Sequence, residues 1–251
     1  PCHYQAASLE SISDDIREDI RDTDALKDIF KKIKPDFVFH LAAQALVRPS
    51  YKNPLETLSI NSLGTASVLE SLKYIDTPVV AIMITSDKVY KNNEWEWGYR
   101  ETDQIGGSDP YSASKGMAEL LISSYFRSFF CETNNNKKIA IARAGNVIGG
   151  GDWAIDRVVP DCVKAWAVGE VVEIRNPYST RPWQHVLEPL SGYLSLAADL
   201  YASKNNNGEA FNFGPISKQN YPVSKLIVEM SKYWKKVKWI STEDVQEEFH
   251  E

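Results

Sequence analysis

Strongly apolar segments alternate with helix-forming segments along the first 145 residues, and this alternation limits the possible folds most. The apolar segments are residues 36–43, 78–85 and 138–143. The helix-forming segments are residues 22–34, 54–74 and 111–132. Apolar strands that alternate with helices are typical of a parallel sheet that is covered on both faces. We therefore predict an α/β fold built on a doubly wound, Rossmann-like parallel sheet.

The pattern is more mixed beyond residue 150. Helical patterns cover residues 155–168, 187–202 and 221–234, and extended patterns cover residues 171–175 and 210–213. A further short strand is expected within residues 11–19. We expect a Rossmann-like domain over residues 1–150 and a smaller mixed region over residues 151–251, interleaved with the first.

Charge and apolar content argue against two classes of partner. The chain of 251 residues has a net charge of −6, so broad affinity for nucleic acid is not expected. No apolar run approaches the roughly 20 residues that span a bilayer, so no membrane partner is expected. The three cysteines lack the spacing of metal ligands, so we expect no metal, and reduced thiols fit a cytoplasmic protein.

A tyrosine and a lysine lie four residues apart in a segment that starts like a helix. Asp109 can cap this helix, and Pro110 suits its first turn. Positions i and i+4 share one helix face, so the Tyr111 hydroxyl and the Lys115 ammonium can reach the same site. A nearby cation lowers the pKa of a phenol, and a tyrosine tuned towards neutral pH can accept a proton from an alcohol. The alternative is a solvated helix face without a catalytic role.

Small and polar residues follow the ends of three predicted strands. They form the segments 41–44 (Leu-Ala-Ala-Gln), 85–88 (Thr-Ser-Asp-Lys) and 143–146 (Arg-Ala-Gly-Asn). Doubly wound sheets bind ligands beyond the carboxyl ends of their strands. The helix of Tyr111 starts between the last two segments, so groups capable of chemistry collect at one edge of the predicted sheet. This grouping favours the catalytic interpretation of the tyrosine and the lysine.

Several motifs match the extended short-chain dehydrogenase/reductases. These motifs are Asp19-Ile20, His40-Leu41-Ala42-Ala43, Asn61, Thr85-Ser86-Asp87 and Tyr111-x-x-x-Lys115. More narrowly, the chain resembles the CDP-glucose 4,6-dehydratase family through the longer segments 85–88, 94–101, 143–153 and 180–190. The resemblance covers nearly the whole chain. It implies an NAD-dependent lyase of deoxysugar and lipopolysaccharide biosynthesis that acts on CDP-glucose.

The family pattern opens with a strand, a glycine-rich turn and a helix, which we do not find here. That turn lets the backbone approach the pyrophosphate of NAD at a helix N-terminus. Gly64 is the first glycine and lies within a predicted helix, and the run of glycines at 149–151 comes far too late. The resemblance therefore implies a chain truncated at both ends, without its first βαβ unit. Residues 1–150 would be a partial NAD-binding domain and residues 151–251 a partial substrate-binding region.

The resemblance implies a role for each residue of two catalytic segments. Tyr111 would take the proton of the sugar 4-hydroxyl while hydride passes to NAD+, and Lys115 would lower the pKa of that tyrosine and hold the nicotinamide ribose. Ser86 would hydrogen-bond the 4-oxygen, and Asp87 would be the acid for water loss. Lys88 would be the base that removes the C5 proton. Because a lysine is a base only when neutral, a salt-bridge residue beside the site is the alternative for Lys88.

The resemblance also implies two sets of binding residues. For NAD they are Asp19, Ile20, Leu41, Ala42, Ala43, Gln44, Asn61 and Thr85, together with Tyr111 and Lys115. For CDP-glucose they are Ser86, Asn146, Arg157, Arg175 and Arg181, since a guanidinium binds pyrophosphate oxygens bidentately. The alternatives are an exposed acidic turn at Asp19, strand-end packing for the two alanines and ordinary surface positions for the arginines.

A homodimer through the helices at 54–74 and 111–132 is typical of the superfamily and is expected of the full-length protein. Two other functions stay open. One is another nucleotide-sugar epimerase, reductase or dehydratase of the same fold, against which the Asp87-Lys88 pair argues. The other is a non-catalytic fragment that lacks the glycine-rich NAD loop.

Overall fold

The computed structural model describes residues 3–132, 135–203, 205–234 and 237–241, and the chain divides into two compact units. The sheet unit comprises Ile12–Ala144 and Leu187–Phe213. The mixed unit comprises Pro1–Ser11, Gly145–Val186 and Gly214–Glu251. Residues beyond 150 thus contribute to both units. The assignment of one region to the cofactor and another to the substrate stays a prediction.

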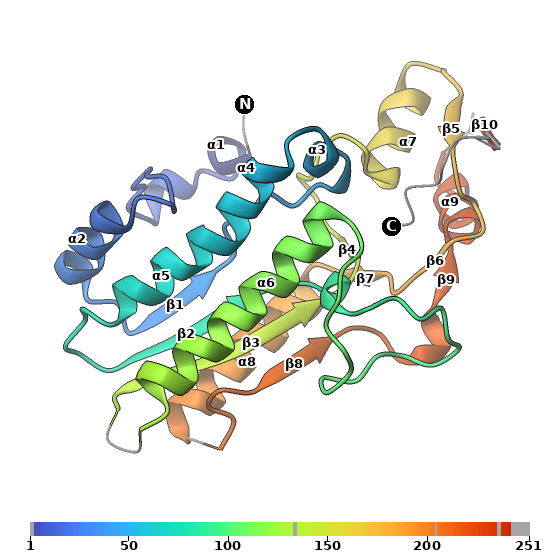
Figure 1. The fold of residues 1–251 in the computed structure, drawn as a ribbon. Helices are drawn as coiled ribbons and strands as arrows, with labels where there is room; N and C mark the ends of the chain where they lie inside the picture. The colour runs from blue at the N-terminus through green and yellow to red at the C-terminus, as the bar shows by residue number, and fades with distance from the viewer. Residues whose placement is uncertain (1–2, 133–134, 204, 235–236, 242–251) are drawn as a thin grey trace. The chain divides into compact units, whose positions relative to one another are not determined.

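A four-stranded parallel sheet forms the centre of the sheet unit, in the order β1-β2-β3-β8 (Figure 1). The strands are β1 (Phe37–His40), β2 (Val79–Ile84), β3 (Lys137–Ala144) and β8 (Ala210–Phe213). All three neighbouring pairs are parallel. This sheet confirms the predicted α/β class. Because parallel strands end at the same edge, the segments 41–44 and 85–88 leave the sheet side by side.

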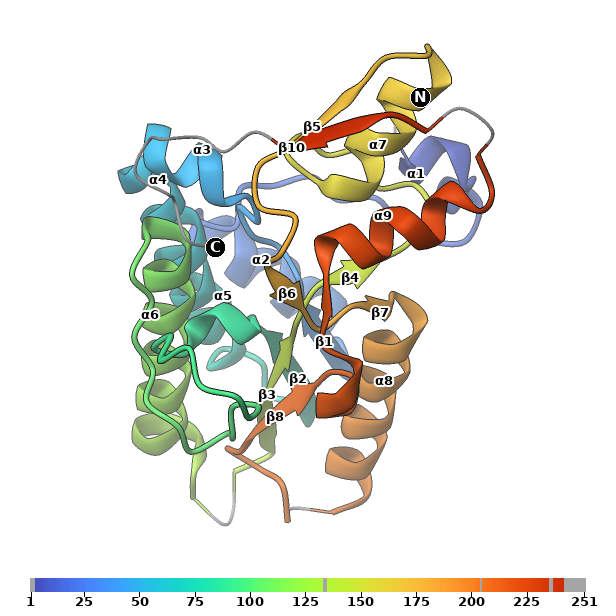
Figure 2. The same cartoon turned by 90° about the vertical axis from the view of Figure 1, so that its right-hand side faces the viewer.

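Helices cover both faces of this sheet (Figure 2). The first face carries α2 (Thr23–Ile33), α5 (Gly64–Leu72) and α6 (Pro110–Tyr125), and the second carries α8 (Leu187–Ala202). Side chains of β2 alternate between two cores, with Ala81 and Met83 on the first face and Val80 and Ile82 on the second. The continuous apolar run of this strand therefore reflects burial on both sides.

The helix predicted over residues 54–74 contains an irregular turn. It starts as α4 (Pro54–Leu58), passes through a π-helical turn at Ser59–Leu63 and continues as α5. The short helix α3 (Val47–Lys52) precedes it, and α6 likewise continues into a π-helical turn at Phe126–Phe130. Such turns are frequent at functional sites, and the first one carries Asn61.

The mixed unit contains short strand pairs and small helices. The pairs are β4 (Val147–Ile148) with β7 (Gln184–His185), β5 (Val172–Ile174) with β10 (Trp239–Ser241), and β6 (Thr180–Arg181) with β9 (Tyr221–Pro222). The helices are α1 (His3–Ala6), α7 (Val158–Ala167) and α9 (Val223–Ser231). Cys162, Trp166 and Ile227 lie in its core. Burial raises the pKa of the Cys162 thiol to about 12, so this cysteine is an inert packing residue.

The prediction of a strand within residues 11–19 is wrong. The structure has a 3-10 turn at Leu9–Ser11 and irregular chain from there to α2. Ile12 and Ile16 are 81% and 49% exposed, so they form no buried strand face. Asp14, Asp15, Glu18 and Asp19 place four carboxylates in this short stretch, and acidic residues are depleted in strands.

A buried aspartate fixes the start of α6. The Asp109 carboxylate accepts hydrogen bonds from Tyr111 N at 2.9 Å, from Ser112 N at 3.0 Å and from the Ser112 hydroxyl. Pro110 occupies the first turn, where a missing N–H costs nothing. α2 starts in a similar way at the exposed Asp22, which accepts one hydrogen bond, from Ala25 N at 3.0 Å.

Replacing these two caps separately should give unequal losses of stability. Asp22→Ala removes one accepted hydrogen bond and should lower the free energy of unfolding by about 1 kcal/mol. Asp109→Ala removes three and takes a partner from the buried Ser112 hydroxyl, so it should cost about 2 kcal/mol or more. Urea unfolding measures both values. An equal or smaller loss in Asp109→Ala would contradict the role of Asp109 as the anchor of α6.

Candidate active site

Tyr111 and Lys115 occupy the first two turns of α6, and both are buried. Tyr111 is 8% exposed and Lys115 is 7% exposed. The helix places them at positions i and i+4 on its buried face, as the spacing predicted. Burial lowers the pKa of the Lys115 ammonium to about 8, against the opposing effect of the Glu119 carboxylate. Lys115 therefore keeps its proton at neutral pH.

His40, the last residue of β1, is influenced by the same lysine. Burial and the charge of Lys115 lower the pKa of His40 to about 4, so the imidazole is neutral at pH 7. Its Nε2 lies 3.0 Å from the Thr65 hydroxyl, and that hydroxyl donates to Asn61 O at 2.7 Å. Nε2 is therefore the donor to Thr65. A neutral imidazole adds no second positive charge beside the lysine.

Asn61 joins the loop after β1 to α6. Its Nδ2 donates to Gln44 O at 2.9 Å and to the Ser114 hydroxyl at 2.8 Å, and its Oδ1 accepts from Gln44 N at 2.8 Å. Asn61 is 2% exposed, so these bonds form away from solvent. Because Ser114 precedes Lys115, the amide fixes the loop after β1 relative to the lysine.

The segment 41–44 follows β1 as an irregular loop. Leu41 and Ala42 are exposed, and Ala43 and Gln44 are half-buried. The Gln44 side chain is held within the loop, because its Nε2 donates to Leu46 O and to the Thr57 hydroxyl, both at 2.9 Å. The backbone and the small side chains of Ala42 and Ala43 remain for contact with a ligand.

Ser86, Asp87 and Lys88 leave the end of β2 in a 3-10 turn, Asp87–Val89. The Ser86 hydroxyl donates to Asp87 Oδ1 at 3.1 Å and accepts from Lys88 N at 3.2 Å. Ser86 is buried, and the two charged residues are half-buried. α6 contacts this turn, and Gly116 faces Val89 O there. The structure therefore brings the two predicted catalytic segments together within the sheet unit.

Glu119 and Arg143 form a buried ion pair that the sequence patterns did not single out. Arg143 Nε donates to Glu119 Oε1 at 2.7 Å, and Arg143 Nη2 donates to Glu119 Oε2. The Thr85 hydroxyl also donates to Glu119 Oε1, at 2.6 Å. One signal was present in the sequence: Tyr111, Lys115 and Glu119 are spaced by four, so all three share a helix face.

Asp19 and Ile20 make contacts inside the sheet unit. Arg21 Nε lies 2.9 and 3.0 Å from the two Asp19 carboxylate oxygens, and this interaction lowers the pKa of Asp19 to about 2. Ile20 packs on α5, where a Cβ on Gly64 would lie 2.5 Å from Ile20 Cδ1. A side chain at position 64 would therefore force the Ile20 side chain to shift. A contact of Asp19 and Ile20 with NAD stays a prediction.

The four residues predicted to bind CDP lie in the mixed unit. Arg157 immediately precedes α7, and Arg175 Nη2 lies 3.9 Å from Asp156 Oδ1. Arg181 Nη1 donates to the carbonyl of the preceding residue at 2.9 Å. Asn146 Oδ1 is buried and accepts no hydrogen bond from the described residues. This acceptor is open to a ligand donor, but the role of all four residues stays a prediction.

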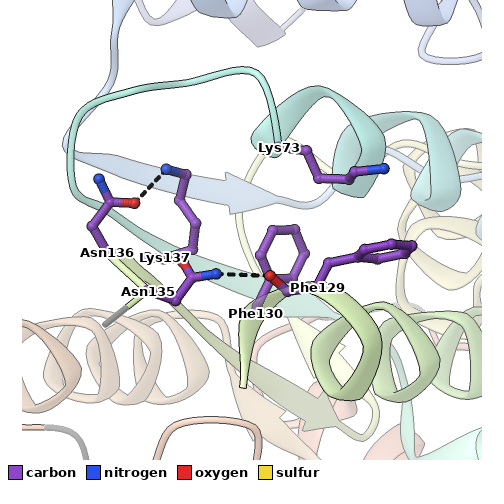
Figure 3. Close-up of a pocket in the computed structure, with 6 residues that line it drawn as sticks. All are labelled: Lys73, Phe129, Phe130, Asn135, Asn136 and Lys137. Carbon is purple, nitrogen blue, oxygen red and sulfur yellow. Dashed lines mark hydrogen bonds between the residues drawn. The ribbon is translucent and has the colours of Figure 1, made fainter. Parts of the chain in front are cut away.

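A pocket of about 440 Å³ lies at the amino ends of β2 and β3, away from the catalytic segments at the carboxyl ends, and its lining side chains are drawn in Figure 3. Its lining residues are Lys73, Phe129, Phe130, Asn135, Asn136 and Lys137. Both lysines already have partners, because Lys73 pairs with Glu70 and Lys137 donates to Asn136 Oδ1. The pocket is separate from the predicted site, because the catalytic segments follow the carboxyl ends of the strands.

Among the described residues, no group of three or more His, Cys, Asp or Glu side chains is placed to hold a metal ion. None of the helices in the described part of the chain is both long and apolar enough to cross a membrane.

The chain is similar to a nucleotide-sugar dehydratase in sequence and to several solved structures in fold. It is 46% identical over 237 residues to the CDP-glucose 4,6-dehydratase of Salmonella typhimurium, which covers 93% of this chain and 66% of that protein. The chain thus spans slightly less than two thirds of the length of this curated relative. Its fold matches Pal from Bacillus thuringiensis with a TM-score of 0.81 at 22% identity, over 98% of this chain and 75% of that one.

A second solved structure is a double mutant of the dTDP-glucose 4,6-dehydratase from Streptomyces venezuelae, determined with NAD bound. It matches with a TM-score of 0.77 at 20% identity, over 96% of this chain and 71% of that one. The family model described as GDP-mannose 4,6 dehydratase matches residues 5–247, which is nearly the whole chain. With this match and the 46% identical relative, the chain belongs to the GDP-mannose 4,6 dehydratase family.

Proposed function

We propose that this chain carries the catalytic centre of an NAD-dependent lyase that converts CDP-glucose to CDP-4-keto-6-deoxyglucose. The observation that carries the proposal is the buried Tyr111–Lys115 pair on α6, which packs against the Ser86–Asp87–Lys88 turn. The Tyr111–Lys115 pair suits removal of a proton from an alcohol. The acid and base side chains of the Ser86–Asp87–Lys88 turn suit elimination of water. The 46% identity to a CDP-glucose 4,6-dehydratase supports CDP-glucose as the substrate. We place the enzyme in the cytoplasm.

The residues present fit the nicotinamide end of NAD. The Lys115 ammonium and the Tyr111 hydroxyl are donors suited to ribose hydroxyls. Ala42 and Ala43, in the loop that Asn61 ties to α6, leave the backbone open to a flat ring. The pyrophosphate end of NAD calls for a glycine-rich turn. The first glycine of this sequence is Gly64, within a helix, so we assign no pyrophosphate contacts here.

The first half-reaction oxidises C4 of the sugar. NAD+ held by Tyr111 and Lys115 would supply the hydride chemistry, by accepting a hydride from C4 and giving it back at C6. Tyr111 accepts the proton of the 4-hydroxyl, and the charge of Lys115 favours the phenolate that does so. With the sugar bound, the Ser86 hydroxyl donates to the 4-oxygen in place of Asp87 Oδ1. The buried position of both residues of the pair keeps water away from the proton transfer.

The second half-reaction removes water across C5 and C6. The 4-ketone makes the C5 proton acidic, and Lys88 in its neutral form takes that proton. The resulting ammonium gives a proton back to C5 when the hydride adds to C6. Asp87 in its protonated form gives a proton to the departing 6-hydroxyl, which leaves as water. Lys88 and Asp87 lie next to each other in one 3-10 turn, so the acid and the base act from the same strand end. Asn146, Arg157, Arg175 and Arg181 are the groups we propose for the CDP moiety.

We further propose that the full-length protein is a homodimer. Apolar side chains are exposed on α4, on the π-helical turn at Ser59–Leu63 and on α6, and these three elements contact one another. Leu55, Leu63, Met117 and Leu120 are 80%, 61%, 45% and 63% exposed. Apolar clusters of this kind on neighbouring helices mark protein–protein interfaces. A second copy of the same surface would cover them.

Two substitutions should separate the oxidation from the elimination. Tyr111→Phe removes the proton acceptor, so neither reduced nicotinamide nor product should form. Lys88→Met should still reduce NAD+ in a single turnover, while release of the keto-deoxy sugar falls by about 10²–10⁴-fold, as expected for loss of a general base. Exchange of the C5 proton with deuterated solvent should disappear together with the product. Single-turnover absorbance of the full-length protein and mass analysis of the sugar measure both steps.

Matched controls are available on the same elements. Lys91→Met changes an exposed lysine three residues further on, and Tyr125→Phe removes a hydroxyl at the far end of α6. Both controls should turn over normally. Near-normal product and C5 exchange in Lys88→Met would leave Lys88 as a charge-balancing neighbour and return the role of base to another group.

The nucleotide preference tests the assignment of the substrate. The full-length protein should turn over CDP-glucose with a kcat/KM about tenfold above the values for dTDP-glucose and GDP-glucose, because a buried polar group without a partner costs about 1–3 kcal/mol and about 1.4 kcal/mol corresponds to tenfold. Side-by-side assays with equal enzyme concentrations give these ratios. A preference for another nucleotide would rule out a CDP-specific pocket formed by Asn146 and Arg181.

Charge placed on the proposed interface should separate the dimer. Leu120→Glu puts a carboxylate on the exposed face of α6, and burying it in a dimer is costly. The variant should sediment as a monomer in analytical ultracentrifugation. Val228→Glu, at a position that is 52% exposed on α9, is the control and should leave the dimer intact. A wild-type monomer, or a Leu120→Glu dimer, would contradict the proposed interface.

A further inference from the structure

A carboxylate that the proposed chemistry does not use lies one helical turn beyond Lys115. Glu119 is 1% exposed, and its partner Arg143 is 4% exposed. Each oxygen of Glu119 is bonded: Oε1 accepts from the Thr85 hydroxyl at 2.6 Å and from Arg143 Nε at 2.7 Å, and Oε2 accepts from Arg143 Nη2. A buried ion pair is often no more stabilising than apolar side chains of similar size. Stability alone therefore gives no reason for a charged pair at this place.

The carboxylate joins three elements that carry the proposed chemistry. Glu119 lies on α6 with Lys115, and Arg143 lies on β3. Thr85 directly follows the central strand β2 and is itself followed by Ser86. The hydrogen bond from Thr85 to Glu119 therefore fixes the distance between the end of β2 and the helix that holds Lys115.

Arg143 extends the contacts of Glu119 into the loop that follows the 87–89 turn. Its Nη1 donates to the Tyr90 hydroxyl at 2.6 Å and to Glu101 O at 2.9 Å. The Tyr90 hydroxyl in turn donates to Asn212 Oδ1 at 2.7 Å, on β8. The guanidinium thus has partners on both sides and holds the Glu119 carboxylate in one orientation.

Glu119 also acts on Lys115 through its charge. The groups around the lysine are Tyr111 and Glu119 on its own helix, the neutral His40 at the end of β1, and Arg143 beyond Glu119 on β3. Burial lowers the pKa of Lys115 to about 8, and Glu119 is the carboxylate that raises it. Without that charge, the lysine would lose its proton at a lower pH.

We propose that Glu119 is a positioning residue for the oxidation step, acting on Lys115 through its charge and on Ser86 through the Thr85 hydroxyl. This inference rests on the proposed function for its catalytic meaning. It does not depend on that function for the contacts themselves. Glu119 touches no reacting atom; it sets the protonation of the lysine and the position of the strand end.

The first test measures the protonation of the Lys115 side chain as a function of pH, without cofactor or substrate. Lysines of the full-length protein are labelled with carbon-13 at Cε, and the signal of Lys115 is identified by its loss in Lys115→Met. In Glu119→Gln, which keeps the size of the side chain but removes its charge, the titration midpoint of Lys115 should fall by about one pH unit or more. Thr85→Val keeps the carboxylate and should leave that midpoint unchanged. Glu170→Gln, an exposed position in the mixed unit, is the control for a general effect of charge.

The second test follows the oxidation step by single-turnover absorbance of reduced nicotinamide with CDP-glucose. The alkaline limb of the pH profile should move to lower pH in Glu119→Gln by the same amount as the Lys115 midpoint. Above the lowered midpoint the rate should fall about tenfold for each further pH unit, since the charged fraction of the lysine then falls tenfold. Thr85→Val should lower the rate without moving the limb. A purely structural role of Glu119 would lower the rate at every pH alike.

The outcomes distinguish the inference from the proposed function. A folded Glu119→Gln with an unchanged Lys115 midpoint overturns the inference. If that variant does not fold, Glu119→Gln/Arg143→Gln removes both charges of the ion pair, so that Arg143 is not left without its carboxylate, and the Lys115 midpoint is measured in the double variant. If neither variant folds, the pair serves the fold and the positioning role is withdrawn. A wild-type protein that never reduces NAD+ with CDP-glucose refutes the proposed function, whereas the titration still decides the effect of Glu119 on Lys115.

Discussion

The hydrogen bonds that Asp109 accepts at the start of α6 set the geometry of the candidate site. A helix that starts one residue earlier or later turns every side chain by about 100°. The cap therefore determines that Tyr111, Lys115 and Glu119 share the buried face of the helix. The N-cap carboxylate costs little to bury because backbone N–H groups and the Ser112 hydroxyl satisfy it. One side chain thus places the proton acceptor, its cation and the carboxylate beside that cation.

The parallel sheet supplies the second half of the site, and buried polar contacts join the halves. β1 and β2 end at the same edge, so the loop at 41–44 and the turn at 87–89 follow neighbouring strands. Asn61 ties the loop to Ser114, and Glu119 ties Thr85 to α6. A buried polar network of this kind stabilises a fold only when every polar group in it has a hydrogen-bond partner. The described atoms of these two contacts meet that condition, which makes them specific links between helix and sheet.

Secondary structure could be predicted from the sequence where a segment has one clear apolar pattern. The apolar runs at 78–85 and 138–143 predicted the two central strands, and the helix at 187–202 has the predicted bounds. The strand within 11–19 failed because its isoleucines are too few to define a buried face among four carboxylates. The Glu119–Arg143 pair was missed for a different reason. A charged residue such as Glu119 in a helical pattern is normally interpreted as exposed. Its partner Arg143 on β3 lies 24 positions away in sequence.

The proposed reaction requires that a hydride removed from C4 of CDP-glucose returns to C6 of the same sugar. The decisive measurement uses CDP-glucose that carries deuterium at C4, with the full-length protein and NAD+. We expect a 4-keto-6-deoxy product with the deuterium in its C6 methyl group, since Tyr111 and Lys115 start the oxidation and the 87–89 turn completes the water loss. Deuterium that returns to C4 with inversion would indicate an epimerase, and deuterium lost to solvent would exclude hydride return. Either result would refute the proposed dehydration.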